Sequence, residues 1–472
     1  MTWIVPNQDS VTLGELQGEL YSVSPRDEFH IGDAFVRRGG TVFAPVRVTG
    51  LKQRRPFGQQ ESLTEQDLND EDWDRQAPGA LQLLKRTAKA LQVFFVEDER
   101  KVARSLLESA AWFITSTFVR PVDGERDDTS AFVPANNKKQ LEESISAIAW
   151  HTSLTVLAVA QRDGVVSLYD AVAGEWDTRV LAHRSQQDIT SLEWSHYSGG
   201  VLAVACRGGI FLWKVPSKRQ EPELLDIVTH PTKRSFQQVA WNEDGSLLAA
   251  FADKTDSVFI IDVIMNRRSE LKCRQQVTAV HWSPTGAYLF VSTASGVSVM
   301  WETCTWQKET WDVAASSCAW SSNGRCLLVA HRNTSLIYPY EFPATPPLIN
   351  VGINTPPIDF AEKQLFSLDK STFEYVGGAI KSLTWDPSGT RVAVTYTPST
   401  SSNGDVGSLV AIFSVAWTPF LIFTMSGLIR GPPKSGVPRS VTFASKFDEG
   451  ALLSIAWSSG LISFHPFYFE ES

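Results

Sequence analysis

The chain has 472 residues, of which 43% are hydrophobic and 20% are charged, and this composition is typical of a globular protein with a sizeable core. Its 43 Lys and Arg residues are outnumbered by 52 Asp and Glu residues, which gives a net charge of -9. Proteins that hold nucleic acid through phosphate contacts are normally basic. We therefore expect no direct nucleic-acid partner.

The N-terminal stretch MTWIVPNQDSVTLGELQGEL has no basic segment followed by an apolar one, so it predicts no secretory signal. The five cysteines are odd in number and form no CxxC pair. This spacing fits neither a disulfide framework nor a zinc site. We expect all five to be reduced and to act as small buried hydrophobic residues.

Residues 1–143 form an N-terminal extension without the repeat that follows. Within it, apolar residues recur at helical spacing in two runs, from Leu81 to Phe95 and from Ala103 to Thr117, with the charged EDERK between them. The pattern predicts a helical hairpin over about 78–118. Because exposed apolar stripes are uncommon, we expect this one to pack against the rest of the protein.

From residue 144 the chain repeats a short alternating strand that ends in an aromatic residue. Each copy is followed by a second apolar run and then by a third. The turns between these runs usually contain Gly or Asp-Gly. The first four spacings between the repeated tryptophans are 44, 47, 41 and 38 residues, close to the roughly 40–45 residues of a four-stranded propeller blade. The repeat positions are Trp150, Trp194, Trp241, Trp282, Trp320, Trp385 and Phe443.

Seven such units predict an all-β fold, a seven-bladed WD40-type β-propeller over 144–472, in which neighbouring blades bury each other's faces. Two wider gaps in the repeat predict surface insertions at 342–377 and 397–407. The seventh unit lacks a following outer strand. We expect a strand near 11–23 to complete it, because a propeller ring is often closed by the other end of the chain.

The stretch from Ser408 to Ile429 has no charged side chain and is long enough to cross a bilayer as a helix. Its position in the repeat favours two strands of blade six instead, joined by a turn at Trp417-Thr418-Pro419. The proline in the middle of the stretch also disfavours a helix. We expect no direct membrane span.

The sequence contains no hydrolase, metalloprotease, phosphate-binding or dinucleotide-binding motif, so we expect no catalytic residues, no cofactor and no metal site. His183 and His230 fall between blades and His281 precedes a repeat tryptophan, so we interpret all three as satisfied structural histidines. The repeat tryptophans have a fixed place in every unit and are interpreted as packing residues, not as a carbohydrate platform.

Three stretches resemble the aladin family of WD-repeat nucleoporins: SVTLGELQGEL (Ser10–Leu20), VLAVACRGGIFLWKV (Val201–Val215) and GALLSIAWSSGLISFHPFYF (Gly450–Phe469). The resemblance extends to LTWDPSGTRVAV (Leu383–Val394). It implies a non-enzymatic scaffold or adaptor of the nuclear pore complex at the nuclear envelope. The implied partners are a transmembrane nucleoporin of the pore membrane and other nucleoporins, and the implied roles are nucleocytoplasmic transport and a link to the mitotic spindle and its poles.

A second hypothesis is a WD40 substrate receptor of a ubiquitin ligase, because WDTR (Trp176–Arg179) matches a motif with which some propellers contact ligase adaptors. In those propellers the motif follows the third strand directly, whereas AVAGE intervenes here. A propeller enzyme is a third hypothesis, and the sequence shows no polar constellation that favours it.

Overall fold

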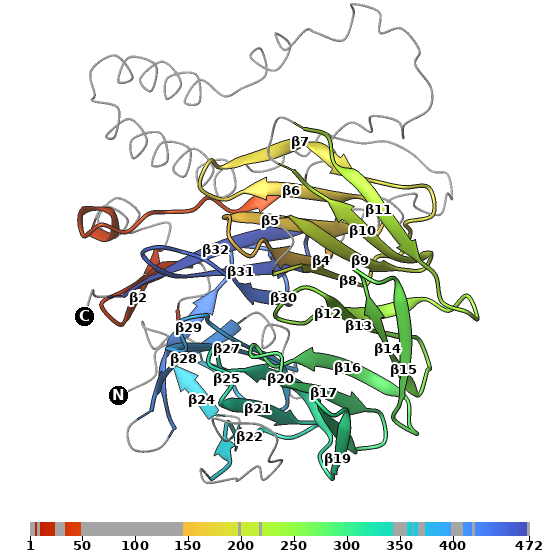
Figure 1. Ribbon diagram of the computed structural model, residues 1–472. Coiled ribbons are helices and arrows are strands. Elements are labelled where there is room, and N and C mark those ends of the chain that lie inside the picture. The colour runs from red at the N-terminus through yellow and green to blue at the C-terminus, as the bar shows by residue number, and fades with distance from the viewer. Residues whose placement is uncertain are drawn as a thin grey trace, which may run out of the picture.

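The computed structural model describes residues 5–6, 10–23, 34–48, 145–196, 200–216, 220–342, 356–361, 363–366, 373–397, 409–417 and 421–469. Within these residues the protein is an all-β, seven-bladed propeller, which confirms the fold predicted from the repeat (Figure 1). The helical hairpin predicted at 78–118 lies outside the described residues, and so does the insertion predicted at 397–407, apart from Thr397.

Blades one to six are antiparallel sheets whose strands follow the order of the chain, and in blade seven three such strands are joined by N-terminal strands. The first strands are β4 (Ile145–Trp150), β8 (Ser191–Trp194), β12 (Phe236–Trp241), β16 (Val277–Trp282), β20 (Ala315–Trp320), β26 (Ile380–Trp385) and β30 (Pro438–Phe443). The second strands are β5 (Val156–Gln161), β9 (Val201–Cys206), β13 (Leu247–Ala252), β17 (Tyr288–Thr293), β21 (Cys326–His331), β27 (Arg391–Tyr396) and β31 (Gly450–Trp457). The third strands are β6 (Val166–Asp170), β10 (Gly209–Lys214), β14 (Ser257–Asp262), β18 (Ser298–Glu302), β22 (Leu336–Glu341), β28 (Leu409–Ala416) and β32 (Leu461–Tyr468). The fourth strands of blades one to six are β7 (Glu175–Leu181), β11 (Glu223–Val228), β15 (Arg267–Lys272), β19 (Gln307–Trp311), β23 (Ile358–Asp359) and β29 (Ile422–Arg430).

First strands lie toward the centre of the ring and fourth strands lie at its periphery, as β12 and β15 show in Figure 1. Burial follows this arrangement, because the second strand sits between two neighbouring blades. Every residue of β9 and β17 is buried, whereas five of the six residues of β15 are exposed. The apolar second runs of the sequence are therefore the core of each blade.

The core consists of clusters of buried side chains that each span two neighbouring blades, and one such cluster lies at every junction around the ring. The junction between blade seven and blade one, where the two ends of the propeller meet, is packed like the others, with Leu452 and Phe464 against Ile148 and Leu157. No blade buries both of its faces alone, so the ring is held together by the sum of these contacts.

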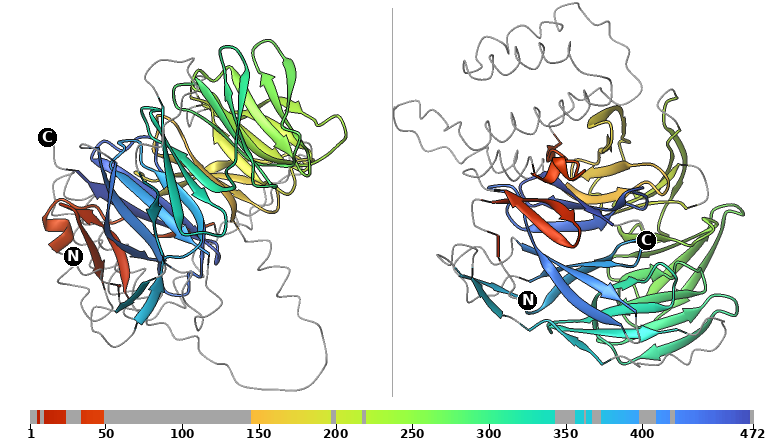
Figure 2. Two further views of the ribbon diagram at one scale, coloured as in Figure 1. Left: turned by 90° about the horizontal axis from the view of Figure 1, so that it is seen from below. Right: turned by 90° about the vertical axis from the view of Figure 1, so that its left-hand side faces the viewer.

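The N-terminal strands lie against the last blade (red beside blue in Figures 1 and 2). The expected closing segment forms a hairpin of β1 (Val11–Leu16) and β2 (Glu19–Val23), and β1 pairs in parallel with the end of β32, with Glu15 opposite Phe467. The short β3 (Val46–Arg47) covers the beginning of the same strand. The outer edge of blade seven is thus paired at both ends.

An ion pair fixes β1 to the neighbouring blade as well. The carboxylate of Glu15 is fully buried and accepts hydrogen bonds from the Nε and Nη2 atoms of Arg391 on β27 of blade six. The same guanidinium lies over the ring of Phe469, 5.2 Å from its centroid. The backbone N–H of Arg430, at the end of β29, donates to Thr12 Oγ1 at 3.1 Å. The N-terminal hairpin therefore contacts both blade six and blade seven and holds them together.

The segment predicted as a surface insertion at 342–377 contributes more than a loop. It contains β23, which pairs with β22 as the outer strand of blade five, and a two-stranded hairpin of β24 (Lys363–Phe366) and β25 (Phe373–Val376). Phe360 is buried and its ring meets that of Phe413 edge-on, 4.6 Å away. Part of the segment therefore fills the junction between blades five and six.

The uncharged stretch from Ser408 to Ile429 supplies β28 and β29, which pair with each other in an antiparallel register. The residues on either side of the predicted turn are strands of blade six, as the repeat indicates. Among the described residues, no helix has the length and apolar character needed to cross a membrane.

Candidate functional site

The seven repeat residues end the seven first strands and point into the junctions between blades. Three of the indole rings donate a hydrogen bond from Nε1 to a backbone carbonyl of the preceding blade. The bonds run from Trp194 to Ala149 (3.2 Å), from Trp241 to Glu193 (3.3 Å) and from Trp282 to Ala240 (3.0 Å). These side chains hold neighbouring blades together, a packing role of the kind that the repeat suggests.

Within the described part of the chain, the other three repeat tryptophans do not donate to a backbone carbonyl of the preceding blade. Trp150 Nε1 donates to the hydroxyl of Ser454 in blade seven at 2.9 Å. The Nε1 atoms of Trp320 and Trp385 are buried and have no hydrogen-bond partner among the described residues. The junctions that precede blades five and six therefore lack this contact. At the first of them, the ring of Trp320 instead stacks on that of Tyr288 in blade four, with the ring centroids 6.4 Å apart.

Polar side chains of the first strands cap the free inner edge of the next blade. Gln238 both donates to the carbonyl of Val280 (2.9 Å) and accepts from its N–H (3.1 Å), so it replaces a missing strand neighbour. Ser317 accepts from the N–H of Leu383 in the same way. Because the innermost strand of a blade is an edge, these caps satisfy backbone groups that would otherwise face the channel. The repeat pattern did not predict these caps, although the polar residues inside QQVAW and SSCAW are a signal for them.

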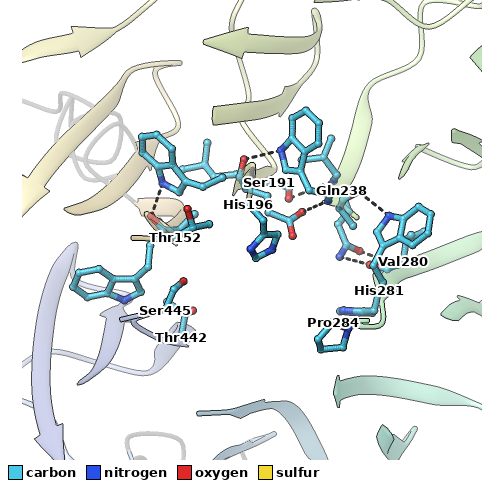
Figure 3. Close-up of a pocket in the computed structure, with 18 of the residues that line it drawn as sticks. Thr152, Ser191, His196, Gln238, Val280, His281, Pro284, Thr442 and Ser445 are labelled. Atoms are coloured by element: carbon cyan, nitrogen blue, oxygen red, sulfur yellow. Dashed lines mark hydrogen bonds between the residues drawn. The ribbon is translucent and has the colours of Figure 1, made fainter. Parts of the chain in front are cut away.

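A cavity of about 540 Å³ opens in the central channel at the end where the first strands finish (Figure 3). Blades one to four and blade seven line it. Figure 3 shows His196, His281 and Ser445 around its open centre, with Gln238 and Val280 joined by their two hydrogen bonds. The lining residues include two carboxylates, Glu193 and Glu243, and no Lys or Arg.

Glu193 is the most perturbed acid of this cavity. It precedes Trp194 on β8, and its Oε2 atom accepts a hydrogen bond of 3.0 Å from the backbone N–H of Trp241 in the next blade. Burial raises the pKa of Glu193 to about 8, and the hydrogen bond from Trp241 opposes that rise. The carboxyl group is therefore positioned by one donor but lacks a full positive charge beside it.

The two histidines of the cavity differ in their surroundings. Burial lowers the pKa of His281 to about 4, so its imidazole is neutral near pH 7. No hydrogen bond to either of its ring nitrogens is present among the described residues, so it is not the satisfied structural histidine that we expected. Burial also lowers the pKa of His196, while the nearby charge of Glu243 acts in the opposite direction.

The other two predicted structural histidines lie in the connections between blades. The Nδ1 atom of His183 accepts from the N–H of Ser185, and that of His230 accepts from the N–H of Thr232. Among the described residues, no group of three His, Cys, Asp or Glu side chains is arranged to hold a metal ion.

The cysteines are all free, as expected, but not all buried. Cys304 is exposed because it lies in the turn between β18 and β19, where its N–H donates to Glu302, whereas the other four cysteines lie in the core. The expectation of five buried thiols was therefore wrong for this residue.

The arginine of the WDTR stretch is already engaged within the molecule. Arg179 forms an ion pair of 2.7 Å with Asp177 and donates to the carbonyls of Pro216 and Gln220 in blade two, so only 9% of its side chain is exposed. An arginine held in this way presents little of its guanidinium group to a ligase adaptor. The geometry does not favour the ubiquitin-receptor hypothesis.

Comparisons with known proteins agree with this architecture. The profile of the family described as the aladin seven-bladed propeller matches residues 127–468. The protein named Aladin from Arabidopsis thaliana is 26% identical over 360 residues, which cover 70% of this chain and 77% of that protein.

The solved structures that match this chain have low sequence identity to it, so they show only that the fold is shared. The β-propeller domain of Cps50 (Swd1) from Myceliophteria thermophila has a TM-score of 0.51 and 16% identity, and the match covers 68% of this chain and 95% of that domain. A chain of the Mitotic Checkpoint Complex has a TM-score of 0.51 and 18% identity, covering 74% of this chain and all of the other. Because the family profile spans most of the chain and the seven blades account for it strand by strand, the protein belongs to the aladin family of seven-bladed propellers.

Proposed function

We propose that the protein is a non-enzymatic scaffold or adaptor of the nuclear pore complex. In this proposal a transmembrane nucleoporin of the pore membrane anchors it at the nuclear envelope, and contacts with other nucleoporins let it support protein transport between nucleus and cytoplasm. A role at the spindle and its poles during mitosis belongs to the same proposal. The observation that carries it is membership of the aladin family over residues 127–468.

The architecture supports a scaffold. A ring with a packed cluster at every junction and a clasped last blade is rigid, and its two faces are built from loops that partners can contact. The single Phe-Gly pair of the sequence, Phe57-Gly58, is far from the many repeats of an FG-rich permeability barrier. A folded adaptor fits both features.

Affinity purification from gently solubilised, cross-linked nuclear envelopes tests this proposal. The tagged full-length protein and an Arg179→Ala variant would be compared by quantitative mass spectrometry. We expect both to recover a transmembrane nucleoporin and other nucleoporins in equal amounts. Recovery of ubiquitin-ligase adaptors with the wild type and their loss with Arg179→Ala would instead support the receptor hypothesis.

A further inference from the structure

The cavity at the mouth of the channel holds two carboxyl groups and, among its described lining residues, no Lys or Arg. Glu193 and Glu243 both line it, and neither belongs to any of the ion pairs found among the described residues. Only one oxygen of Glu193 has a hydrogen-bond partner there, the N–H of Trp241. The second oxygen has no hydrogen-bond partner among the described residues and is available to a ligand in the cavity.

His281 adds a further unpartnered group to the same cavity. Its imidazole is neutral near pH 7 and carries one free acceptor nitrogen and one free donor nitrogen. It comes from blade four, whereas Glu193 comes from blade two and Glu243 from blade three. The three side chains therefore line the cavity from three neighbouring blades.

The face around the cavity is also acidic. The loops that join first to second strands and third to fourth strands carry, among the described residues, more acidic than basic side chains. The exposed or half-buried acidic ones are Glu221, Glu243, Asp244, Asp448 and Glu449, and the basic ones are Arg325 and Lys446. On the opposite face, the described loops of blades two and three carry Arg207, Lys233, Arg234, Lys254 and Arg274 against Asp253 and Asp256. We call the first surface the acidic face.

Large apolar side chains are exposed on the acidic face as well, in turns of blades one, three and six. Most of the large hydrophobic residues that are exposed lie in or beside its turns, and they are Leu154, Val172, Ile264, Met265, Trp417 and Ile422. Ile264 is 77% exposed at the tip of the turn between β14 and β15. Exposed apolar side chains on the same face as an acidic cavity give a partner that lies across this face apolar groups to contact.

We propose that this cavity binds the guanidinium group of an arginine from an extended segment of a partner protein. Glu243 supplies an anionic acceptor and His281 a neutral one. The carboxyl group of Glu193 is mostly protonated near pH 7 in the empty cavity, and a bound guanidinium lowers its pKa so that it releases the proton to solvent and becomes a second anionic acceptor. Apolar residues that flank the arginine contact the exposed turns of the acidic face. Arginine fits better than a metal ion, because the described residues offer no group of three ligands. It also fits better than lysine, because its five donors match acceptors that come from three directions.

The space available agrees with an entire side chain. A cavity of about 540 Å³ is many times larger than the roughly 30 Å³ that one water molecule occupies in the liquid. The residues that follow the first strands, among them Thr152, His196 and Pro284, form its mouth, so a segment lying across the acidic face can insert one side chain. This inference does not depend on the nuclear-pore role.

Fluorescence polarisation with the full-length protein tests the proposal. The probe is a labelled peptide of sequence Gly-Leu-Arg-Leu-Gly, and its control contains citrulline, which has the same shape without the charge, in place of arginine. We expect saturable binding of the arginine peptide, at least tenfold weaker binding of the citrulline peptide, and weaker arginine binding as salt is added.

Variants locate the site. Glu193→Gln and Glu243→Gln should each weaken the arginine peptide at least tenfold, whereas Glu223→Gln, on the same face but outside the cavity, should leave it unchanged. The Glu193→Gln side chain keeps an oxygen that accepts from the N–H of Trp241. If Glu193→Gln nevertheless unfolds, the affinity of Glu243→Gln for the arginine peptide tests the proposal. Equal affinity for both peptides, no saturable binding up to 1 mM, or unchanged affinity in the cavity variants would overturn the proposal.

Discussion

Replacing Glu15 tests how the ring is closed. The carboxylate of Glu15 is fully buried, and its charge is compensated by Arg391 of blade six, whose own side chain is only 12% exposed. Glu15→Ala leaves that guanidinium buried without its partner. Breaking a buried ion pair by removing one member typically costs about 3–5 kcal/mol. For a domain of this size, the loss corresponds to a melting temperature that is lower by roughly 4–7 °C.

The matched control is an exposed ion pair of the same chemistry. Asp188 and Arg207 lie 3.7 Å apart with side chains that are 65% and 73% exposed, so Arg207→Ala should cost no more than about 1 kcal/mol. Thermal unfolding followed by tryptophan fluorescence measures both variants, and hydrogen exchange at β32 reports whether the edge of blade seven has opened. If Glu15→Ala melts within 1 °C of Arg207→Ala, the ion pair between Glu15 and Arg391 does not hold the ring closed and the reasoning fails.

Three further predictions concern the blades themselves. Trp282→Phe should destabilise the protein by about 1–2 kcal/mol more than Trp385→Phe in urea unfolding, because only the Trp282 indole donates to a carbonyl of the preceding blade; equal costs would contradict this. Burial lowers the pKa of His465 to about 4, so the unfolded chain, with a histidine pKa near 6.5, binds the proton first as the pH falls. The stability of the wild type should therefore drop between about pH 6.5 and pH 4 by up to about 3 kcal/mol more than that of His465→Gln, and parallel pH profiles would refute it. A Cβ on Gly14 would lie 2.5 Å from the carbonyl oxygen of Pro466, so Gly14→Ala should raise hydrogen exchange in β1 and β32, and wild-type protection would argue against the close contact.

The sequence predicted the blades well because the same signal occurs seven times. Each of the repeat positions, from Trp150 to Phe443, ends a first strand, since an alternating run followed by a glycine turn has one simple solution in a propeller. The closing role of the segment near 11–23 followed from the missing fourth strand of the last unit. The sequence did not indicate that this segment is a hairpin or that its first strand pairs in parallel.

The candidate site was much harder to predict. Glu193, Gln238 and His281 are separated by tens of residues, and they line one cavity only because the first strands of neighbouring blades surround one axis. The contact between Glu15 and Arg391 joins residues 376 positions apart. A pattern read along the chain places residues on strands, but it does not give the spacing across a ring. The polar residues inside the first strands were nevertheless visible, and they line the channel.

Localisation of the tagged full-length protein in intact cells, with and without depletion of the transmembrane nucleoporins, tests the proposed role most directly. The account predicts a punctate nuclear rim that disperses when the anchoring nucleoporin is removed. A diffuse cytosolic signal in both conditions would contradict it, and would mean that the chain has the fold of the aladin family without its place at the pore.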